Sequence, residues 1–358
     1  MTRPSDRGRT RIAAPVLLSW ALAALAFPAQ AQPPILAYLL RGEGQVELRR
    51  EAWTSFHPIQ AGAPLRAGDQ LRLAADAMAV VLCADFATPP WRPTRGVRSA
   101  VLDACPRKPE LLALPDGLTA GTRAGHAATL RVRTPRGWIR DDAPWIRWQA
   151  AMEGKFEARV LLGSRAIWGW VLVSGTEQRM PPGFLEPGLP YRLQVRRYRQ
   201  QALVETEIPF TLLDAEKRQE IRQEESKLLA LFPQEGLESR LSRALYLAHQ
   251  HLWDEALALF DALAPDLPAS TAAELLRGRL ALGLALLDVA EERLTRARAL
   301  AGSHGDLETE AAALAALASI AANGEQKTAW LEAAQALYRK LGDAAAAEDL
   351  RGRLGSSP

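Results

Sequence analysis

The chain has 358 residues, of which 48% are hydrophobic and 24% are charged, a composition typical of a globular protein. Its 44 Lys and Arg residues outnumber its 41 Asp and Glu residues, but residues 1–31 hold four of the arginines and one of the acids, so 40 of each remain. The near-neutral remainder lacks the excess of positive charge that neutralises phosphates, which argues against a nucleic-acid partner.

Residues 1–31 have the pattern of a signal peptide. Four arginines precede an apolar run from Ile12 to Phe27, and Ala29-Gln30-Ala31 matches the small-x-small pattern of a signal-peptidase site. We expect an exported chain that begins at Gln32, meets the membrane only during export, and resides in the periplasm or beyond. The apolar run is shorter than the ~20 residues of a membrane-spanning helix. An uncleaved leader that anchors the chain to the inner membrane is the alternative.

Residues 32–110 are predicted to form a small β domain. Alternating runs of strand length stand at 44–50, 69–75 and 77–85. Four motifs in a fixed order resemble the FecR-like domain of bacterial envelope proteins: Gly44-x-Val46, Pro64-Leu65, Gly68-Asp69-x-Leu71 and Cys83-Ala84-Asp85. The resemblance implies a β-rich periplasmic module. Because no cytoplasmic segment or true membrane span is recognised, we expect a free-standing envelope protein and not a membrane transducer.

The chain has two cysteines, Cys83 and Cys105, and both lie in this domain. In an exported protein a single pair of cysteines is most simply a disulfide. Closing a loop of about 20 residues would contribute about 3 kcal/mol by loop-closure entropy. A redox-active pair is the alternative, and the spacing is far from Cys-x-x-Cys.

Residues 130–213 are predicted to form a small β-sandwich. Six alternating runs of strand length stand at 129–135, 144–150, 156–162, 166–173, 190–198 and 204–213. The run from Leu185 to Val195 is similar to the Leu-x-Pro-Gly-x-x-Tyr-x-x-x-Val run of fibronectin type III domains, in which the Tyr forms a corner at the start of a late strand. The resemblance implies a fibronectin III/Ig-like core that contains Trp148, Phe156, Leu185 and Tyr191.

Five tryptophans fall within 33 positions of this domain: Trp138, Trp145, Trp148, Trp168 and Trp170. Residues two apart in a strand share a face, so we expect Trp168 and Trp170 on one side and Trp145 and Trp148 on opposite sides. The cluster has two interpretations. It forms an aromatic platform for a carbohydrate or a partner protein, or it covers the seam between two modules.

Residues 214–232 are predicted to form a connector helix. Asp214 is a plausible N-cap, and charges of both signs recur at helical spacing before the apolar residues Leu228, Leu231 and Phe232. We expect a rigid spacer that docks this apolar end on the helices that follow.

Residues 237–354 are predicted to be entirely helical, with an internal repeat. Three positions match after 34 residues: Ala244 with Gly278, Ala256 with Ala290, and Phe260 with Leu294. Thirty-four is the period of the tetratricopeptide repeat (TPR), and these residues resemble its small crossing positions and the large apolar residue one turn later. A third copy places Ala334 and Tyr338 at the same sites if about ten extra residues are allowed. A generic Ala/Leu-rich helical bundle is the alternative.

The TPR resemblance implies a concave face, lined by the first helix of each repeat, that binds a protein or peptide. Carried onto this sequence, the candidate partner-binding residues are Glu238, Leu241, Leu245 and His249 in the first copy and Ala272, Leu275, Arg279 and Leu282 in the second. Packing against the connector helix is the alternative role of these residues.

Catalytic motifs are not recognised in the sequence. It contains no Gly-x-Ser-x-Gly, phosphate-binding Gly-rich loop or His-Glu-x-x-His. His249 and His251 are two apart on a helix, which is poor geometry for a shared metal. No enzyme activity, catalytic residue, metal or cofactor is therefore predicted.

The predicted fold is multi-domain β + α, with two small β modules, FecR-like and fibronectin III/Ig-like, followed by a TPR-like solenoid. The predicted function is a non-catalytic periplasmic scaffold or adaptor that binds a protein or peptide through its repeats. Two alternatives remain. The β domains detect an envelope ligand and the repeats relay the signal, or the FecR-like domain attaches the protein to peptidoglycan. Neither partner nor oligomeric state follows from the sequence.

Overall fold

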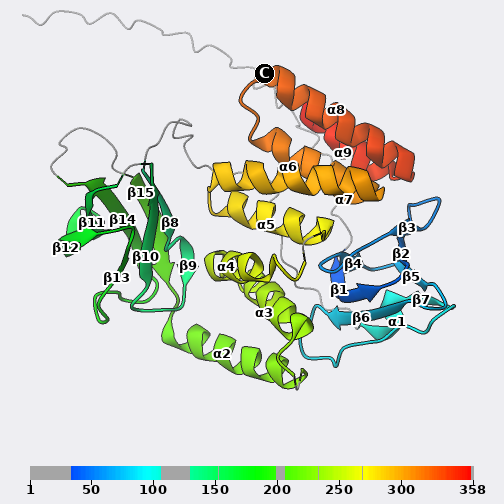
Figure 1. Cartoon of the computed structure of the whole chain (residues 1–358), viewed down its shortest axis with the longest axis horizontal. Helices are drawn as coiled ribbons and strands as arrows, with labels where there is room; N and C mark the ends of the chain where they lie inside the picture. The colour runs from blue at the N-terminus through cyan, green and yellow to red at the C-terminus, as the bar shows by residue number, and fades with distance from the viewer. Residues whose placement is uncertain are drawn as a thin grey trace, which may run out of the picture. The chain divides into compact units, whose positions relative to one another are not determined.

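The computed structural model describes residues 34–105, 130–151, 153–198, 206–232, 234–267 and 269–355 (Figure 1). The predicted signal peptide and residues 106–110 lie outside these ranges. Four small β-sheets come first in the chain, and a run of packed helices follows. The predicted order of β modules before helices is confirmed.

The first β module has two small antiparallel sheets. One has the order β4-β1-β6, with β4 at Pro64–Arg66, β1 at Ile35–Glu43 and β6 at Met78–Cys83. The other has the order β3-β2-β5-β7, with β3 at His57–Pro58, β2 at Val46–Arg49, β5 at Gln70–Leu73 and β7 at Arg98–Ala100. Both sheets bury alternate residues in one shared core, which includes Leu39 of β1, Leu48 of β2 and Leu71 of β5.

A disulfide closes this module. Cys83, at the end of β6, is bonded to Cys105, which follows the short helix α1 (Val101–Ala104), and the two Cα atoms are 5.3 Å apart. Both cysteines are buried in the core of the module. The predicted disulfide is confirmed, and it links the end of β6 to the residue that follows α1.

The second β module is a sandwich of two sheets. One has the order β13-β10-β8, with β13 at Glu177–Arg179, β10 at Trp145–Ala150 and β8 at Leu130–Thr134. The other has the order β12-β11-β14-β15-β9, with β12 at Arg165–Ser174, β11 at Lys155–Leu162, β14 at Pro190–Arg197, β15 at Thr206–Leu212 and β9 at Gly137–Ile139. Strand β9 pairs with β15 in parallel, and the other pairs are antiparallel.

The residues expected in the sandwich core, Trp148, Phe156, Leu185 and Tyr191, lie in one apolar cluster between the two sheets. Tyr191 is 1% exposed. Its hydroxyl accepts a hydrogen bond from the Glu186 N–H at 2.6 Å and donates one to the Glu186 carbonyl at 3.1 Å. These two bonds fix the chain at the corner before β14, which is the role that a tyrosine corner has in such sandwiches.

The expected placement of Trp168 and Trp170 on one face is wrong. Ala158 of β11 pairs with Val171 of β12, but Val160 pairs with Trp168, so three steps along β12 match two along β11. This bulge reverses the alternation of side chains within β12. Trp168 is therefore in the core, whereas the Trp170 ring lies on the outer face beneath two arginine side chains.

Helices α2 to α9 fill the rest of the described chain (Figure 1). Their bounds are α2 Ala215–Ala230, α3 Leu237–His249, α4 Trp253–Leu263, α5 Thr271–Gly283, α6 Leu287–His304, α7 Leu307–Ser319, α8 Gly324–Leu341 and α9 Ala344–Gly355. The carboxylate of Asp214 caps α2 by accepting a hydrogen bond from the Lys217 N–H at 2.6 Å. None of the helices in the described ranges is both long and apolar enough to cross a membrane.

The helices pack as successive antiparallel pairs, and small residues lie where the pairs are closest. Ala256 of α4 and Ala290 of α6 are fully buried. A Cβ atom added to Gly278 of α5 would lie 2.6 Å from Cγ and Cδ2 of Leu294 on α6, so only glycine permits this approach. In the third pair, α7 with α8, Ala334 is likewise buried, and α9 packs against α8.

Candidate functional site

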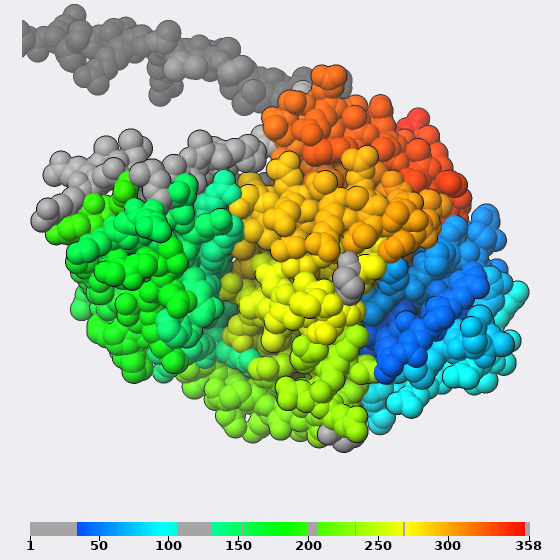
Figure 2. All heavy atoms as spheres, viewed as in Figure 1, coloured from blue at the N-terminus to red at the C-terminus, as the bar shows by residue number. Residues whose placement is uncertain are grey.

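The predicted partner-binding face on α3 is covered by the first β module. Leu241 and Leu245 are buried in an apolar core that also contains Tyr38 and Leu40 of β1 and Phe86 of the loop after β6. Figure 2 shows this module, in blue and cyan, lying directly against the helices in lime and yellow. The α3 residues that were expected to contact a partner therefore contact the chain itself.

The two polar residues of the predicted α3 face pair with the same strand. His249 Nε2 is 2.8 Å from the Tyr38 hydroxyl, and its ring stands edge-on to Tyr38 and to Phe86. The Glu238 carboxylate is 3.1 Å from the Arg41 guanidinium. Burial lowers the pKa of His249 to about 3, so the imidazole is neutral in this contact.

The predicted α5 residues divide into covered and partly accessible ones. Ala272 packs in the core of the first β module, and Leu282 is buried among the helices. Leu275 and Arg279 are partly exposed. The structure thus brings the α3 and α5 residues to the side on which the first β module docks, and leaves part of α5 accessible there.

A buried ion cluster joins the first β module to α7. The Arg50 guanidinium donates to Asp69 Oδ2 at 2.6 Å and to both carboxylate oxygens of Glu308, at 2.8 and 2.6 Å. Asp69 belongs to the predicted Gly-Asp turn, and its carboxylate also accepts from the Arg66 N–H at 2.7 Å. One side chain therefore links the turn of the β module to the first turn of a helix more than 250 residues later in the chain.

The two carboxylates of this cluster have opposite pKa shifts. Burial raises the pKa of Asp69 to about 6, although Arg50 favours its charged form. Burial also opposes ionisation of Glu308, but Arg50 and Arg66 outweigh it and hold the pKa of Glu308 below its usual value. The cluster is a structural contact, since all of its charged groups are paired with each other.

The second β module docks on the helices through arginines. Arg136 donates to the carbonyls of Leu284, at the end of α5, and of Val132, both at 2.7 Å. Arg140 pairs with Glu255 of α4 at 2.7 Å and also with Glu225 of α2. The contact between the second β module and the helices is thus polar.

Two tryptophans of the second β module are exposed. Trp138 and Trp145 are 44% and 41% exposed, and guanidinium groups of Arg147 and Arg179 lie 5.4 and 5.9 Å from the Trp145 ring centre. Trp148 is buried in the sandwich core, so Trp145 and Trp148 point to opposite sides of β10.

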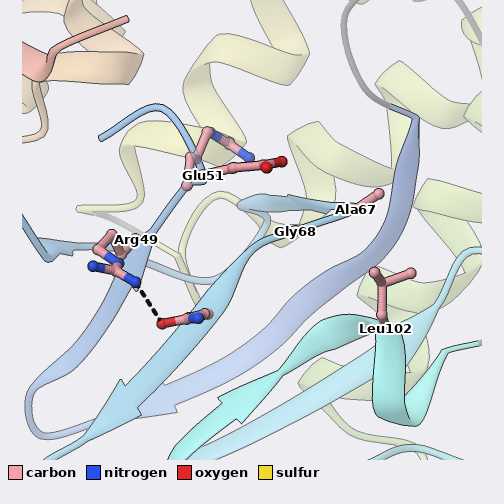
Figure 3. Close-up of a pocket in the computed structure, with 7 residues that line it drawn as sticks. Arg49, Glu51, Ala67, Gly68 and Leu102 are labelled. Carbon is pink, nitrogen blue, oxygen red and sulfur yellow. Dashed lines mark hydrogen bonds between the residues drawn. The ribbon is translucent and has the colours of Figure 1, made fainter. Parts of the chain in front are cut away.

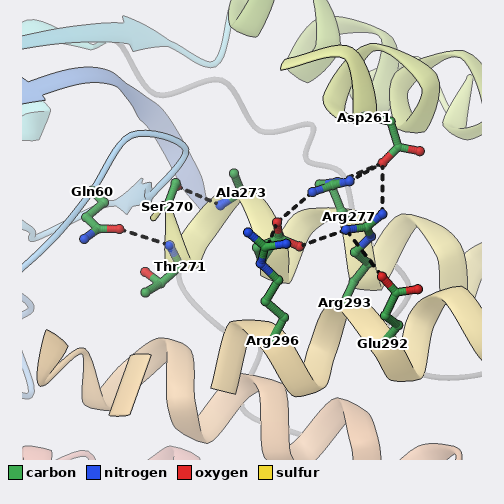
Figure 4. A network of polar contacts seen from close by, with 10 residues as sticks. Gln60, Asp261, Ser270, Thr271, Ala273, Arg277, Glu292, Arg293 and Arg296 are labelled. Carbon is green, nitrogen blue, oxygen red and sulfur yellow. Dashed lines mark hydrogen bonds and ion pairs between the residues drawn. The ribbon is translucent and has the colours of Figure 1, made fainter. Parts of the chain in front are cut away.

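A second ion network lies within the repeats (Figure 4). Arg277 of α5 pairs with Glu274 at 2.7 Å and with Asp261 of α4 at 2.9 Å. Glu274 is 3% exposed, and the guanidinium groups of Arg293 and Arg296 on α6 lie 3.9 and 3.6 Å from it. These contacts tie α4, α5 and α6 together.

The close-up of the first β module shows a pocket (Figure 3). Its volume is about 510 Å³, and it is lined by Arg49, Arg50, Glu51, Ala67, Gly68, Gln70 and Leu102. The Arg49 guanidinium donates to Gln70 Oε1 at 3.0 Å across its wall. In the described ranges no group of three or more His, Cys, Asp or Glu side chains is placed to hold a metal ion.

Sequence reasoning missed the arginines that dock the modules. Arg50, Arg136 and Arg140 read as ordinary surface residues, because arginine is usually exposed. The only local signal was Asp69 in its Gly-Asp turn, which marks a carboxylate without naming its partner.

Comparisons with known proteins do not identify a family. No family model matches the chain, and no curated protein matches it. A solved structure, the β-1,2-glucanase from Parabacteroides distasonis, aligns at 10% identity and a TM-score of 0.22, covering 86% of this chain and 49% of the glucanase. The chain therefore spans about half the length of that protein. A TM-score of this size supports no conclusion about fold or activity.

Proposed function

We propose that this chain is a non-catalytic scaffold of an extracytoplasmic compartment, which binds a protein or peptide through its helical repeats. The observation that carries the proposal is the repeated helix pair. Helices α3 and α4 correspond to α5 and α6 after 34 residues, with small residues at matching crossing points, as in repeats that commonly serve as binding frames.

The disulfide supports the proposed location outside the cytoplasm. A disulfide between Cys83 and Cys105 is consistent with an oxidising environment outside the cytoplasm. We expect no reactive thiol in the unreduced protein after denaturation. Two reactive thiols per chain would argue for a reducing compartment and against this part of the proposal.

The accessible part of the predicted face lies on α5. A partner that displaced the first β module from α3 would expose Tyr38, Leu40 and the surrounding core, at about 2 kcal/mol for each large apolar side chain. A partner that binds beside the docked module avoids this cost. Glu238 and His249 of α3 are partly exposed too, but they already pair with Arg41 and Tyr38 of β1. We therefore assign the contact to the two partly exposed candidates on α5, Leu275 and Arg279.

The test is capture of envelope proteins by residues 32–358, followed by mass spectrometry. The bait carrying Leu275→Ala and Arg279→Gln should retain the partner at least about tenfold less than the unmodified bait, the effect of losing about 1.4 kcal/mol. Arg298→Gln on the exposed side of α6 is the matched control and should retain it fully.

The result that contradicts the proposal is equal retention by all three baits, or no partner above background. Circular dichroism of each bait verifies that the substitutions leave the fold intact. A bait without helices is unsuitable, because Tyr38 and Leu40 of its first module would lose their helix contacts and become exposed.

A further inference from the structure

The outer face of the sheet β3-β2-β5-β7 carries a row of arginines. Across the sheet Glu47 lies opposite Arg72, which lies opposite Arg98, and in the next row Arg49 lies opposite Gln70. Residues in register on neighbouring antiparallel strands project from the same face. Their neighbours in sequence point inward and form the core of the module, so this row faces solvent.

Phe56 holds the three guanidinium groups in place. Its ring centre lies 4.4 Å from Cζ of Arg72 and 5.5 Å from Cζ of both Arg49 and Arg98. A guanidinium that packs on a ring keeps its N–H edge available for planar, bidentate hydrogen bonds to a carboxylate. The aromatic ring thus orders three flexible side chains before any ligand binds.

The charges of this face are only partly balanced. The Glu47 carboxylate pairs with Arg72 at 2.5 Å, and Arg49 donates to the neutral amide of Gln70 at 3.0 Å. Among the described residues, no carboxylate lies within ion-pair distance of Arg98, which is exposed. Glu51 lines the adjoining pocket, so three arginines stand against two glutamates and a local excess of one positive charge remains.

We propose that this face, defined by Arg49, Phe56, Gln70, Arg72 and Arg98, binds an acidic peptide segment of a partner protein. Carboxylate side chains of the segment pair with the guanidinium edges of Arg98 and Arg49. The pocket of about 510 Å³ opens at the end of the same face, because Arg49 and Gln70 belong to both, and it offers room for one side chain of the segment (Figure 3).

The positive charge of this face favours a ligand that carries carboxylates. Bidentate arginine contacts suit planar carboxylates. Arg72 and Arg98 lie opposite each other on strands about 4.8 Å apart, and Arg49 lies one row away on β2. Side chains on alternate positions of an extended peptide are about 6.6 Å apart, a difference that the long arginine side chains can accommodate. This surface is separate from the repeat contact proposed above and goes beyond it, since it needs no residue of α5.

The test is fluorescence anisotropy of a labelled octaglutamate peptide titrated with residues 32–358 at low ionic strength. We expect saturable binding that Arg98→Gln weakens about tenfold, because it removes one charge-assisted contact. Phe56→Leu should weaken it too, since the guanidinium groups lose their ordering ring. Arg165→Gln, at an exposed arginine of the sandwich, is the matched control and should bind as the unmodified chain does.

Three results overturn the proposal: no saturable binding of octaglutamate, equal affinity of the Arg98→Gln and Arg165→Gln variants, or equally tight binding of polyphosphate of the same charge with the same sensitivity to Arg98→Gln. The last would assign the face to anionic polymers in general. The variant with Leu275→Ala and Arg279→Gln should bind octaglutamate normally, so failure of this proposal and failure of the repeat contact are distinguishable.

Discussion

Replacing Arg50 with Met leaves two buried carboxylates without their shared cation. The Arg50 side chain is 7% exposed, and its partners Asp69 and Glu308 are 2% and 18% exposed. Met preserves most of the apolar stem, so the change is mainly electrostatic. Removing one partner of a buried ion pair costs about 3–5 kcal/mol, because the remaining charge stays desolvated.

The expected loss for Arg50→Met is about 3 kcal/mol at pH 7.5, the lower end of that range. Asp69 keeps the hydrogen bond from the Arg66 N–H at 2.7 Å, which compensates part of its charge. The pKa of Asp69 is already raised to about 6 by burial. That value holds with Arg50 in place, and since Arg50 lowers the pKa of Asp69, the pKa is higher still in the variant. Protonation of Asp69 removes the unpaired charge, so the loss should shrink as the pH falls from 7.5 towards 6.

Urea unfolding followed by tryptophan fluorescence measures this loss, and buried Trp53 reports on the site because its ring lies 5.2 Å from the Arg50 guanidinium. The control is Arg147→Met, which breaks the exposed pair with Glu177 and should cost at most about 1 kcal/mol. If both variants lose the same small amount, the buried cluster does not fix the first β module to α7. A double-mutant cycle with Glu308→Gln then isolates the pair.

Three further predictions use the same unfolding assay. Tyr191→Phe should lose about 2 kcal/mol, because two corner hydrogen bonds disappear; an unchanged midpoint would refute the corner. Gly278→Ala should destabilise by about 1 kcal/mol, since the clash with Leu294 exceeds the gain in helix propensity; Gly352→Ala, whose Cβ meets nothing, should not. Burial raises the pKa of Asp254 to about 6, so ionisation of this carboxyl opposes folding. The free energy of unfolding should therefore rise as the pH falls from 7.5 to 5, and Asp254→Asn should lessen that rise. An equal rise in both proteins would contradict the raised pKa of Asp254.

The helical repeat was predictable because its constraint is local. Two helices that approach closely require a missing or minimal side chain at the crossing, and Gly278, Ala256 and Ala290 record that requirement in the sequence. The disulfide was predictable for a similar reason. A chain whose two cysteines are Cys83 and Cys105 has one way to pair them within the chain.

The orientation of Trp170 was not predicted because alternation holds only while the strand pairing is unbroken. One extra residue in β12 between Trp168 and Val171 moves Trp170 to the outer face. Gly169 lies in that interval, and an isolated glycine in a strand often marks a bulge. The sequence therefore contained the signal, although not the register of the partner strand.

The occupant of the α3 face was beyond local reasoning. Helical periodicity marks Leu241 and Leu245 as an apolar stripe, but a stripe does not reveal whether it is covered by a partner or by the same chain. Strand β1 covers the stripe on α3. The Tyr38–His249 contact that joins this strand to the helix is between residues 211 positions apart. Such a contact depends on how three modules pack together, which no short pattern encodes.

Hydrogen–deuterium exchange of residues 32–358, with and without the captured partner, tests the proposed scaffold function most directly. Protection on binding should fall on α5, around Leu275 and Arg279, while the sandwich of residues 130–213 exchanges as before. Protection confined to the sandwich, with α5 unchanged, would contradict binding through the helical repeats.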